Sequence, residues 1–154
     1  MKVSPELINA VARWEGGRAK DGLFHPYRDS AGVWTIGFGH TAGVSAQSSP
    51  WTLKQAQAAL SQELNDRYLP AIVKRGLPLD QKQLDALASF VYNLGVGTLD
   101  AGRSIGDALR SRDWRRAAAD AMLLYDHAGA KKLPGLTRRR QWERQLFLGG
   151  TYDH

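Results

Sequence analysis

Two carboxylates and a hydroxyl lie close together in the segment between Trp14 and Thr41. Glu15 follows an apolar stretch, Asp29 precedes a Ser-Ala-Gly turn signal, and Thr35 follows that turn. An acid, a base and a hydroxyl that positions a water molecule are the groups needed to split a glycosidic bond with water. The sequence therefore predicts that Glu15, Asp29 and Thr35 form a hydrolytic catalytic site.

A helix near the N-terminus is predicted to position Glu15. Ser4 is a suitable N-cap and Pro5 a suitable first helical residue. Apolar residues then recur at helical spacing until Gly16-Gly17 ends the helix. Glu15 lies three and four residues after two of these apolar positions. We therefore expect it at the edge of the buried face and not on the solvent side.

A β-hairpin is predicted to position the other two groups. Residues 33–38 alternate, so Trp34, Ile36 and Phe38 share a face that is expected to pack on the core. Thr35 lies on the opposite face and is expected to point away from that core. The turn at 30–32 would fold the strand that ends at Asp29 against the Thr35 strand, which brings both side chains toward one cleft.

The rest of the chain is predicted to be helical, so that the fold class is α+β and mostly α-helical. Periodicity and capping residues give the following expected elements: a helix capped by Thr52 and interrupted near Pro70, a buried central helix capped by Asp80, a short helix over 104–109, a helix from Asp113 to His127, a loop over 129–135 and a last helix capped by Thr137.

Composition indicates an ordinary globular protein without disulfides. The 154 residues include no cysteine, and the formal net charge is +6. Residues 1–100 carry 10 basic and 9 acidic side chains, a net of +1, whereas residues 101–154 carry 11 and 6, a net of +5. A basic face attracts polyanions, although a solvated face that only aids solubility is an equally good interpretation. We find neither a signal peptide nor a transmembrane segment.

The order of the motifs resembles that of the phage-type lysozymes, the endolysins of glycoside hydrolase family 24. Glu15, YRDSAGVWTIGFGHT, FVYNLGVGTL and GLTRRRQWERQLF occur in that family's order, and TIGFGHT and the terminal RRxxE pattern are the most specific parts. The resemblance covers nearly the whole chain, from about residue 6 to residue 147.

The resemblance implies a single catalytic domain over 1–154 with the two-lobed lysozyme fold. A small β-containing lobe is expected over about 16–60, and a helical lobe over about 78–150 with the first helix packed on it. The implied activity is hydrolysis of the β-1,4 bond between N-acetylmuramic acid and N-acetylglucosamine in peptidoglycan. Matched by position, Glu15 is the family's acid, Asp29 its second carboxylate and Thr35 its catalytic threonine.

An arginine on the last helix is expected to pair with the catalytic acid. Arg139, Trp142 and Leu146 share one helical face, and an arginine in line with an apolar face usually reaches a buried acid. The family pattern places such an arginine against the glutamate, so we expect an Arg139–Glu15 ion pair. The alternative is that residues 138–140 only decorate the N-terminus of the helix.

One part of the segment departs from the family pattern. Thirteen residues, 16–28, separate Glu15 from Asp29, a longer connection than is common in the family, whereas five residues separate Asp29 from Thr35 as usual. The extra residues are interpreted as a loop insertion. The resemblance implies a water held by Asp29 and Thr35 and inversion at the anomeric carbon, an outcome that depends on the carboxylate separation.

Four further residues are expected to contact substrate: Tyr27, Phe38, His40 and Asn93. For His40, a structural role that ties the β segment together is an equal alternative, and for Asn93 the alternative is a helix C-cap. The four histidines lack the spacing of metal ligands. We therefore expect no metal site, and the proposed chemistry needs no cofactor.

The partners that follow are peptidoglycan as substrate, an anionic envelope polymer contacted by the basic C-terminal half, and a holin-like release partner implied by the family. The protein is expected to be a monomer that binds no nucleic acid, stays in the host cytoplasm before release, and then acts on the cell wall or in the periplasm.

Two alternative functions remain open. One is a lytic transglycosylase, which needs the acid but no activated water. The other is a catalytically inactive basic module that binds the wall or nucleic acid.

Overall fold

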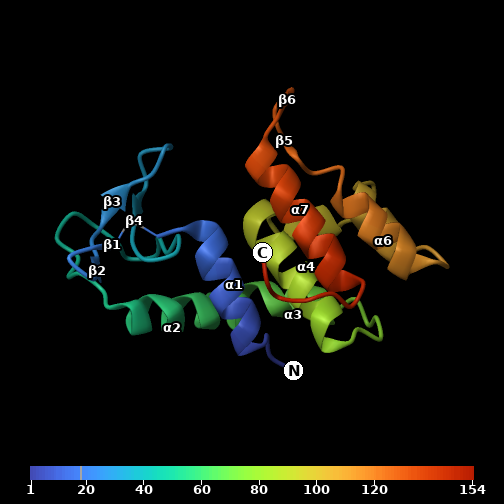
Figure 1. The fold of residues 1–154 in the computed structure, drawn as a ribbon, viewed down its shortest axis with the longest axis horizontal. Coiled ribbons are helices and arrows are strands. Elements are labelled where there is room, and N and C mark those ends of the chain that lie inside the picture. The colour runs from blue at the N-terminus through green and yellow to red at the C-terminus, as the bar shows by residue number, and fades with distance from the viewer. Residues whose placement is uncertain (18) are drawn as a thin grey trace.

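The two β-hairpins within residues 19–35 and helix α2 (Leu53–Glu63) lie on one side of the molecule, and most of the remaining helices lie on the other, together with the hairpin of residues 127–132 (Figure 1). The computed structural model describes residues 1–17 and 19–154. Helix α1 (Pro5–Glu15) runs between the two groups in this view. The mostly helical α+β class predicted from the sequence is confirmed.

Helix α1 begins and ends where the sequence predicts. The Ser4 side chain accepts a hydrogen bond from the Leu7 amide at 3.1 Å, and Pro5 is the first helical residue. Gly16 adopts the left-handed conformation (φ 73°), which glycine reaches without steric cost, and its amide donates to Ala12 O. With these caps, Glu15 is the final residue of the helix.

The segment interpreted as a loop insertion contains a second β-hairpin. Strands β1 (Ala19–Lys20) and β2 (Leu23–Phe24) pair antiparallel around a turn in which both Asp21 and Gly22 have positive φ. Phe24 also forms a bridge with Trp51, with backbone hydrogen bonds of 2.7 and 2.8 Å. Arg18 lies outside the described residues. The insertion is therefore fastened to the chain that enters α2.

The predicted hairpin around the second carboxylate is present but shorter than expected. Strands β3 (Tyr27–Arg28) and β4 (Trp34–Thr35) pair antiparallel, with Tyr27 opposite Thr35. The expected alternation over 33–38 is wrong beyond Thr35, because residues 35–38 are all buried. Gly37 turns the chain at φ 63° and Ile36 pairs with His40, so that both sides of this stretch are covered.

Helix α2 (Leu53–Glu63) continues through a π-helical segment, η1 (Leu64–Tyr68), into α3 (Leu69–Val73). Thr52 and Gln55 form a reciprocal capping box at the start of α2. The expected interruption near Pro70 is this π segment, which precedes the proline. A π turn inserts one residue into the ladder and shifts the side chains that follow it around the helix axis.

Helix α4 (Gln81–Leu94) is the buried central helix, as predicted. Asp80 caps it with a capping box to Gln83, and every residue from 83 to 91 is buried. Helix α7 (Pro134–Phe147) packs against it. The remaining helical elements are η2 (Val96–Leu99), α5 (Ser104–Leu109) and α6 (Trp114–Met122).

Three predictions near the C-terminus are wrong. Helix α7 begins at Pro134 and not after Thr137, because proline at the first helical position fixes φ and needs no amide partner. The Thr137 hydroxyl instead donates to Asp126 Oδ2 and Leu133 O. The segment before α7 contains the antiparallel pair β5 (His127–Ala128) and β6 (Lys131–Lys132), and α6 ends before Tyr125.

Among the described residues, no helix combines the length and the apolar character needed to cross a membrane.

Candidate active site

Glu15 and Arg139 meet at the C-terminal end of α1. Arg139 Nη1 donates to Glu15 Oε1 at 2.8 Å, and the exposed fractions of the two side chains are 5% for arginine and 25% for glutamate. The ion pair expected from the sequence is therefore formed between residues 124 positions apart in the chain. The alternative, that Arg139 is only a solvated side chain at the helix N-terminus, is wrong, because its guanidinium group is buried between α7, α4 and Glu15.

A cavity of about 270 Å³ opens at Glu15. Its lining comes from α1, from the turn that follows β4, from α2 and η1, and from the end of α4. The lining residues are Glu15, Gly39, Thr41, Ala42, Glu63, Arg67, Tyr68, Tyr92 and Asn93. A carboxylate that is three-quarters covered and faces such a cavity is suited to proton transfer with a bound ligand. A larger cavity, of about 590 Å³ between η2 and α5, contains none of the predicted catalytic residues.

Two tyrosines, Tyr68 and Tyr92, line this cavity together with Glu15. Their rings meet edge to face with centroids 5.2 Å apart. Burial raises the pKa of Tyr68 and of Tyr92, and the negative charges of Glu15 and Glu63 add to the rise. Both phenols therefore stay protonated near neutral pH. Tyr92 donates its hydrogen to Phe38 O at 2.6 Å, which joins α4 to the chain after β4.

Asp29 and Thr35 lie on the β3–β4 hairpin. The backbone amide of Asp29 donates to Val33 O at 3.0 Å, and Asp29 Oδ1 accepts the amide hydrogens of Ala31 and Val33, both at 2.9 Å. Thr35 is 3% exposed, and its hydroxyl donates to Val33 O at 3.0 Å. Both side chains therefore lie on one hairpin, Asp29 half-buried and Thr35 buried.

The predicted residues therefore fall into two groups. Glu15 and Asn93 line the cavity and Arg139 pairs with Glu15, whereas Asp29 and Thr35 lie on the β3–β4 hairpin. Of the described residues, neither Asp29 nor Thr35 is among those that line the cavity.

Two of the expected substrate contacts, His40 and Phe38, pack against other side chains around the β-hairpins and α2. The His40 ring pairs with Glu63 through Nδ1, contacts Ala42 O through Nε2 at 3.0 Å, and lies 5.2 Å from the Trp51 ring. Phe38 is 7% exposed, and its ring packs on Phe24 with centroids 5.1 Å apart. We interpret His40 as a tie between the β segment and α2, and the Phe38 ring as part of the core. Tyr27 is half-buried opposite Thr35.

Sequence reasoning missed the cavity residues Glu63, Arg67, Tyr68 and Tyr92. The pair at 63 and 67 has the i, i+4 spacing of a solvated helix face, which is how a polar pair on a helix is normally interpreted. Tyr92 directly precedes Asn93 in the FVYNLGVGTL motif, and this position was the one signal in the sequence that could have identified Tyr92. Only the packing of α1 against α2 and α4 decides that these side chains surround Glu15.

This chain is similar to several known proteins in sequence and in fold. The family model described as phage lysozyme matches residues 12–143. The endolysin of Salmonella phage P22 is 36% identical over 154 aligned positions, which cover 96% of this chain and 99% of that protein. The SAR-endolysin of Enterobacteria phage PA-2 is 30% identical, with coverage of 95% and 98%.

A solved structure of a P22 lysozyme mutant matches with a TM-score of 0.80 and 34% identity, covering 97% of this chain and 99% of that one. The fold and the matched sequence together define the class: this chain belongs to the phage lysozyme family.

Proposed function

We propose that this protein is an endolysin that acts as a muramidase, a glycoside hydrolase cleaving the β-1,4 bond between N-acetylmuramic acid and N-acetylglucosamine in bacterial peptidoglycan. The supporting observation is the 2.8 Å Arg139–Glu15 pair at a 270 Å³ cavity in a member of the phage lysozyme family. Side chains and water supply all of the proposed chemistry.

In the proposed mechanism Glu15 protonates the oxygen of the leaving sugar. Asp29 accepts a proton from the attacking water, and the Thr35 hydroxyl orients that water. The carboxylate of Asp29 also stabilises the positive charge that develops on the sugar ring in the transition state. Water attack on the face opposite to the leaving group inverts the anomeric carbon. Asn93, at the cavity, and Tyr27 are proposed substrate contacts.

The test is Glu15→Gln compared with Glu6→Gln, since both carboxylates lie on α1 and Glu6 is exposed in the first turn. Loss of a general acid costs about 10²–10⁴-fold in rate. We expect Glu15→Gln to lose at least about 100-fold in the clearing of cell-wall suspensions, on the same scale, and Glu6→Gln to match wild type. Equal clearing by both variants would remove Glu15 from the mechanism.

The products distinguish hydrolysis from the transglycosylase reaction. A transglycosylase releases an anhydro sugar that is one water lighter than the hydrolytic product, and it needs neither a base nor a hydroxyl to position water, the roles proposed for Asp29 and Thr35. Mass spectrometry of digested peptidoglycan is expected to give hydrated reducing ends. Proton NMR of the first-formed anomer then tests inversion.

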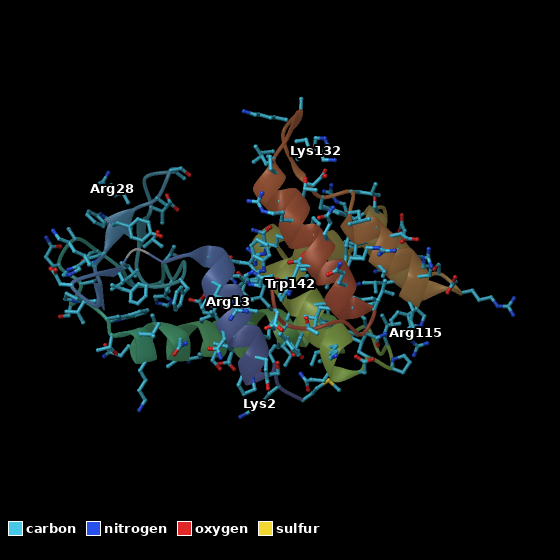
Figure 2. All side chains as sticks on the ribbon, in the orientation of Figure 1. Lys2, Arg13, Arg28, Arg115, Lys132 and Trp142 are labelled. Carbon is cyan, nitrogen blue, oxygen red and sulfur yellow. The ribbon has the colours of Figure 1, made fainter. Side chains whose placement is uncertain are left out.

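We further propose that the basic C-terminal half contacts an anionic polymer of the envelope. Arg115 and Lys132, which belong to this half, lie at the periphery of the molecule, whereas Trp142 lies near its centre (Figure 2). Such contacts weaken with salt.

The protein is proposed to be monomeric and to remain in the host cytoplasm until a holin-like partner releases it to act on the wall. Several similar proteins are named SAR-endolysins.

A further inference from the structure

Three charged side chains of α7 are buried next to one another. The exposed fractions of these side chains are 5% for Arg139 and 0% for both Arg140 and Glu143. Burying a charge is costly unless partners compensate for the lost water. The proposed catalytic chemistry uses Arg139 and leaves Arg140 and Glu143 without a role, although Glu143 belongs to the RRxxE pattern of the last helix.

The Glu143 carboxylate holds Arg139 from the side opposite to Glu15. Glu143 Oε1 accepts a hydrogen bond from Arg139 Nε at 3.3 Å, while Arg139 Nη1 reaches Glu15 at 2.8 Å. One edge of the guanidinium group is thus fixed by α7 itself, and the other edge meets α1. Because a guanidinium group is planar and rigid, fixing one edge also orients the other.

Two further groups fix Glu143. Ser89, on α4, donates its hydroxyl hydrogen to Oε1 at 2.7 Å. Arg140 donates from Nη2 to Oε1 at 3.0 Å and places Nε 2.7 Å from Oε2, while its guanidinium group lies over the Phe90 ring at 5.0 Å. Helices α4 and α7 therefore jointly determine where Arg139 points.

We propose that Glu143 and Ser89 are positioning residues for the catalytic acid, which hold Arg139 so that it sets both the rotamer and the charge environment of Glu15. This inference rests on the proposed function, since it takes Glu15 as the acid. Neither residue touches the cavity, and both act through Arg139.

The charges in this network alternate. The negative Glu15 pairs with the positive Arg139, and Arg139 pairs with the negative Glu143. The last member is the positive Arg140, which pairs with Glu143. Burial raises the pKa of the Glu143 carboxyl, and the two arginines and Ser89 oppose that rise. Replacing this carboxylate by an amide leaves one uncompensated positive charge behind Glu15, which favours its ionised form.

The other ionisable groups that face Glu15 are unchanged by such a substitution. They are Glu63, Arg67 and Tyr68 from α2 and η1, and Tyr92 from α4. A shift of the pH dependence of activity in Glu143→Gln would therefore report on Arg139 and its buried partner.

The experiment measures kcat and KM for release of reducing ends from purified peptidoglycan between pH 5 and 9 at constant ionic strength. For Glu143→Gln we expect kcat to fall by about 10–100-fold, as displacement of a catalytic group by about 1 Å does, with KM unchanged. We also expect the basic limb of the profile to move down by about one pH unit. Glu143→Asp keeps the charge, so its basic limb should stay in place and part of kcat should be recovered.

Ser89→Ala separates orientation from charge. It removes the hydroxyl that donates to Glu143 Oε1 at 2.7 Å and accepts from Arg139 Nη2 at 3.5 Å, but it removes no charge. We therefore expect a lower kcat with an unmoved basic limb. The matched control is Asp120→Asn, which adds the same unit of charge at the exposed ion pairs with Arg116 and Arg144. We expect its activity and pH profile to match wild type.

Circular dichroism first establishes which variants fold. If Glu143→Gln does not fold, Ser89→Ala and Glu143→Asp decide the question, and wild-type kcat in both would overturn the proposal. A folded Glu143→Gln with wild-type kcat and an unmoved basic limb would also overturn it. Loss of activity in Glu15→Gln is measured alongside, because full activity there would overturn the proposed function itself and not only the positioning role.

Discussion

At the scale of single residues, Asp29 combines a turn-forming role with its proposed chemical one. Its Oδ1 accepts two backbone amides, those of Ala31 and Val33, and this closes the turn between β3 and β4. An Asp side chain favours this position because it can bond to the amide two residues further on. Those hydrogen bonds also fix the direction of the carboxylate, so the turn orients the proposed base.

The two roles can be separated by substitution. Asparagine keeps a side-chain oxygen that accepts the amides but cannot take a proton from water, whereas alanine loses both functions. We expect Asp29→Asn to lose activity by at least about 100-fold, as removal of a general base does, with a thermal midpoint close to that of wild type. Asp29→Ala should lose activity and also unfold at a lower temperature. A fully active Asp29→Asn would contradict the role proposed for this carboxylate.

At the scale of elements, capping explains which helix boundaries were predictable. The Gln83 amide donates to Asp80 Oδ1 at 2.8 Å, and the Asp80 amide donates to Gln83 Oε1 at 3.1 Å. Asp113 stands at the equivalent place before α6 but makes no side-chain cap bond. An aspartate at the N-cap position therefore stabilises α4 more than α6, because only the Asp80 side chain is placed to accept a hydrogen bond from the helix.

This difference predicts unequal losses of stability. Loss of an N-cap hydrogen bond costs about 0.5–2 kcal/mol. We expect Asp80→Ala to lower the free energy of unfolding within that range, and Asp113→Ala to lower it by less than about 0.5 kcal/mol, as is typical of surface substitutions. Urea unfolding monitored by circular dichroism measures both. Equal losses would show that the capping box does not stabilise α4.

The β elements were less predictable than the helices. The turn at 30–32 carries a local signal, and the β3–β4 hairpin forms as predicted. The bridge between Phe24 and Trp51 joins residues 27 positions apart in the chain, so no local sequence pattern predicts it. In the same way, burial of Thr35 depends on what covers both faces of a short strand, which periodicity alone does not determine.

At the scale of the whole molecule, the last residues connect helices that are distant in sequence. The Tyr152 hydroxyl donates to Asp85 Oδ2 on α4 at 2.7 Å, and Arg13 of α1 donates to Tyr152 O at 3.1 Å. The His154 ring stacks on Trp14 at 4.2 Å and meets Trp142 at 5.2 Å. This segment therefore joins α1, α4 and α7 on the side of the Arg139–Glu15 pair.

This packing predicts a pH-dependent contribution to stability. Partial desolvation of the His154 ring, which contacts Trp14 and Trp142, lowers the pKa of its imidazole below 6.5, and the charges of Arg13 and Arg139 add to the effect. The unfolded chain then binds more protons than the folded one below pH 6.5, so the contribution is complete above that pH and falls as pH drops through it.

Wild type and His154→Gln are compared by urea unfolding at pH 7.5 and 5.5, with the exposed His25→Gln as control. We expect the stability advantage of wild type over His154→Gln to shrink at pH 5.5, because glutamine does not titrate. The advantage over His25→Gln should not follow that pattern. A larger advantage over His154→Gln at the lower pH would contradict the assigned direction.

The sequence by itself determined the identity and order of the chemical groups, the helices with local caps, and the turn that carries Asp29, because each depends on residues within a few positions of one another. It also indicated that Arg139 pairs with a buried acid, since a cation in line with an apolar face needs a partner, and the family resemblance identified that acid as Glu15. Tertiary structure alone decided that Tyr68, Tyr92, Glu63 and Arg67 surround Glu15 and that Glu143 lies behind Arg139. These contacts join helices far apart in the chain, and which helix faces meet depends on how the whole core packs.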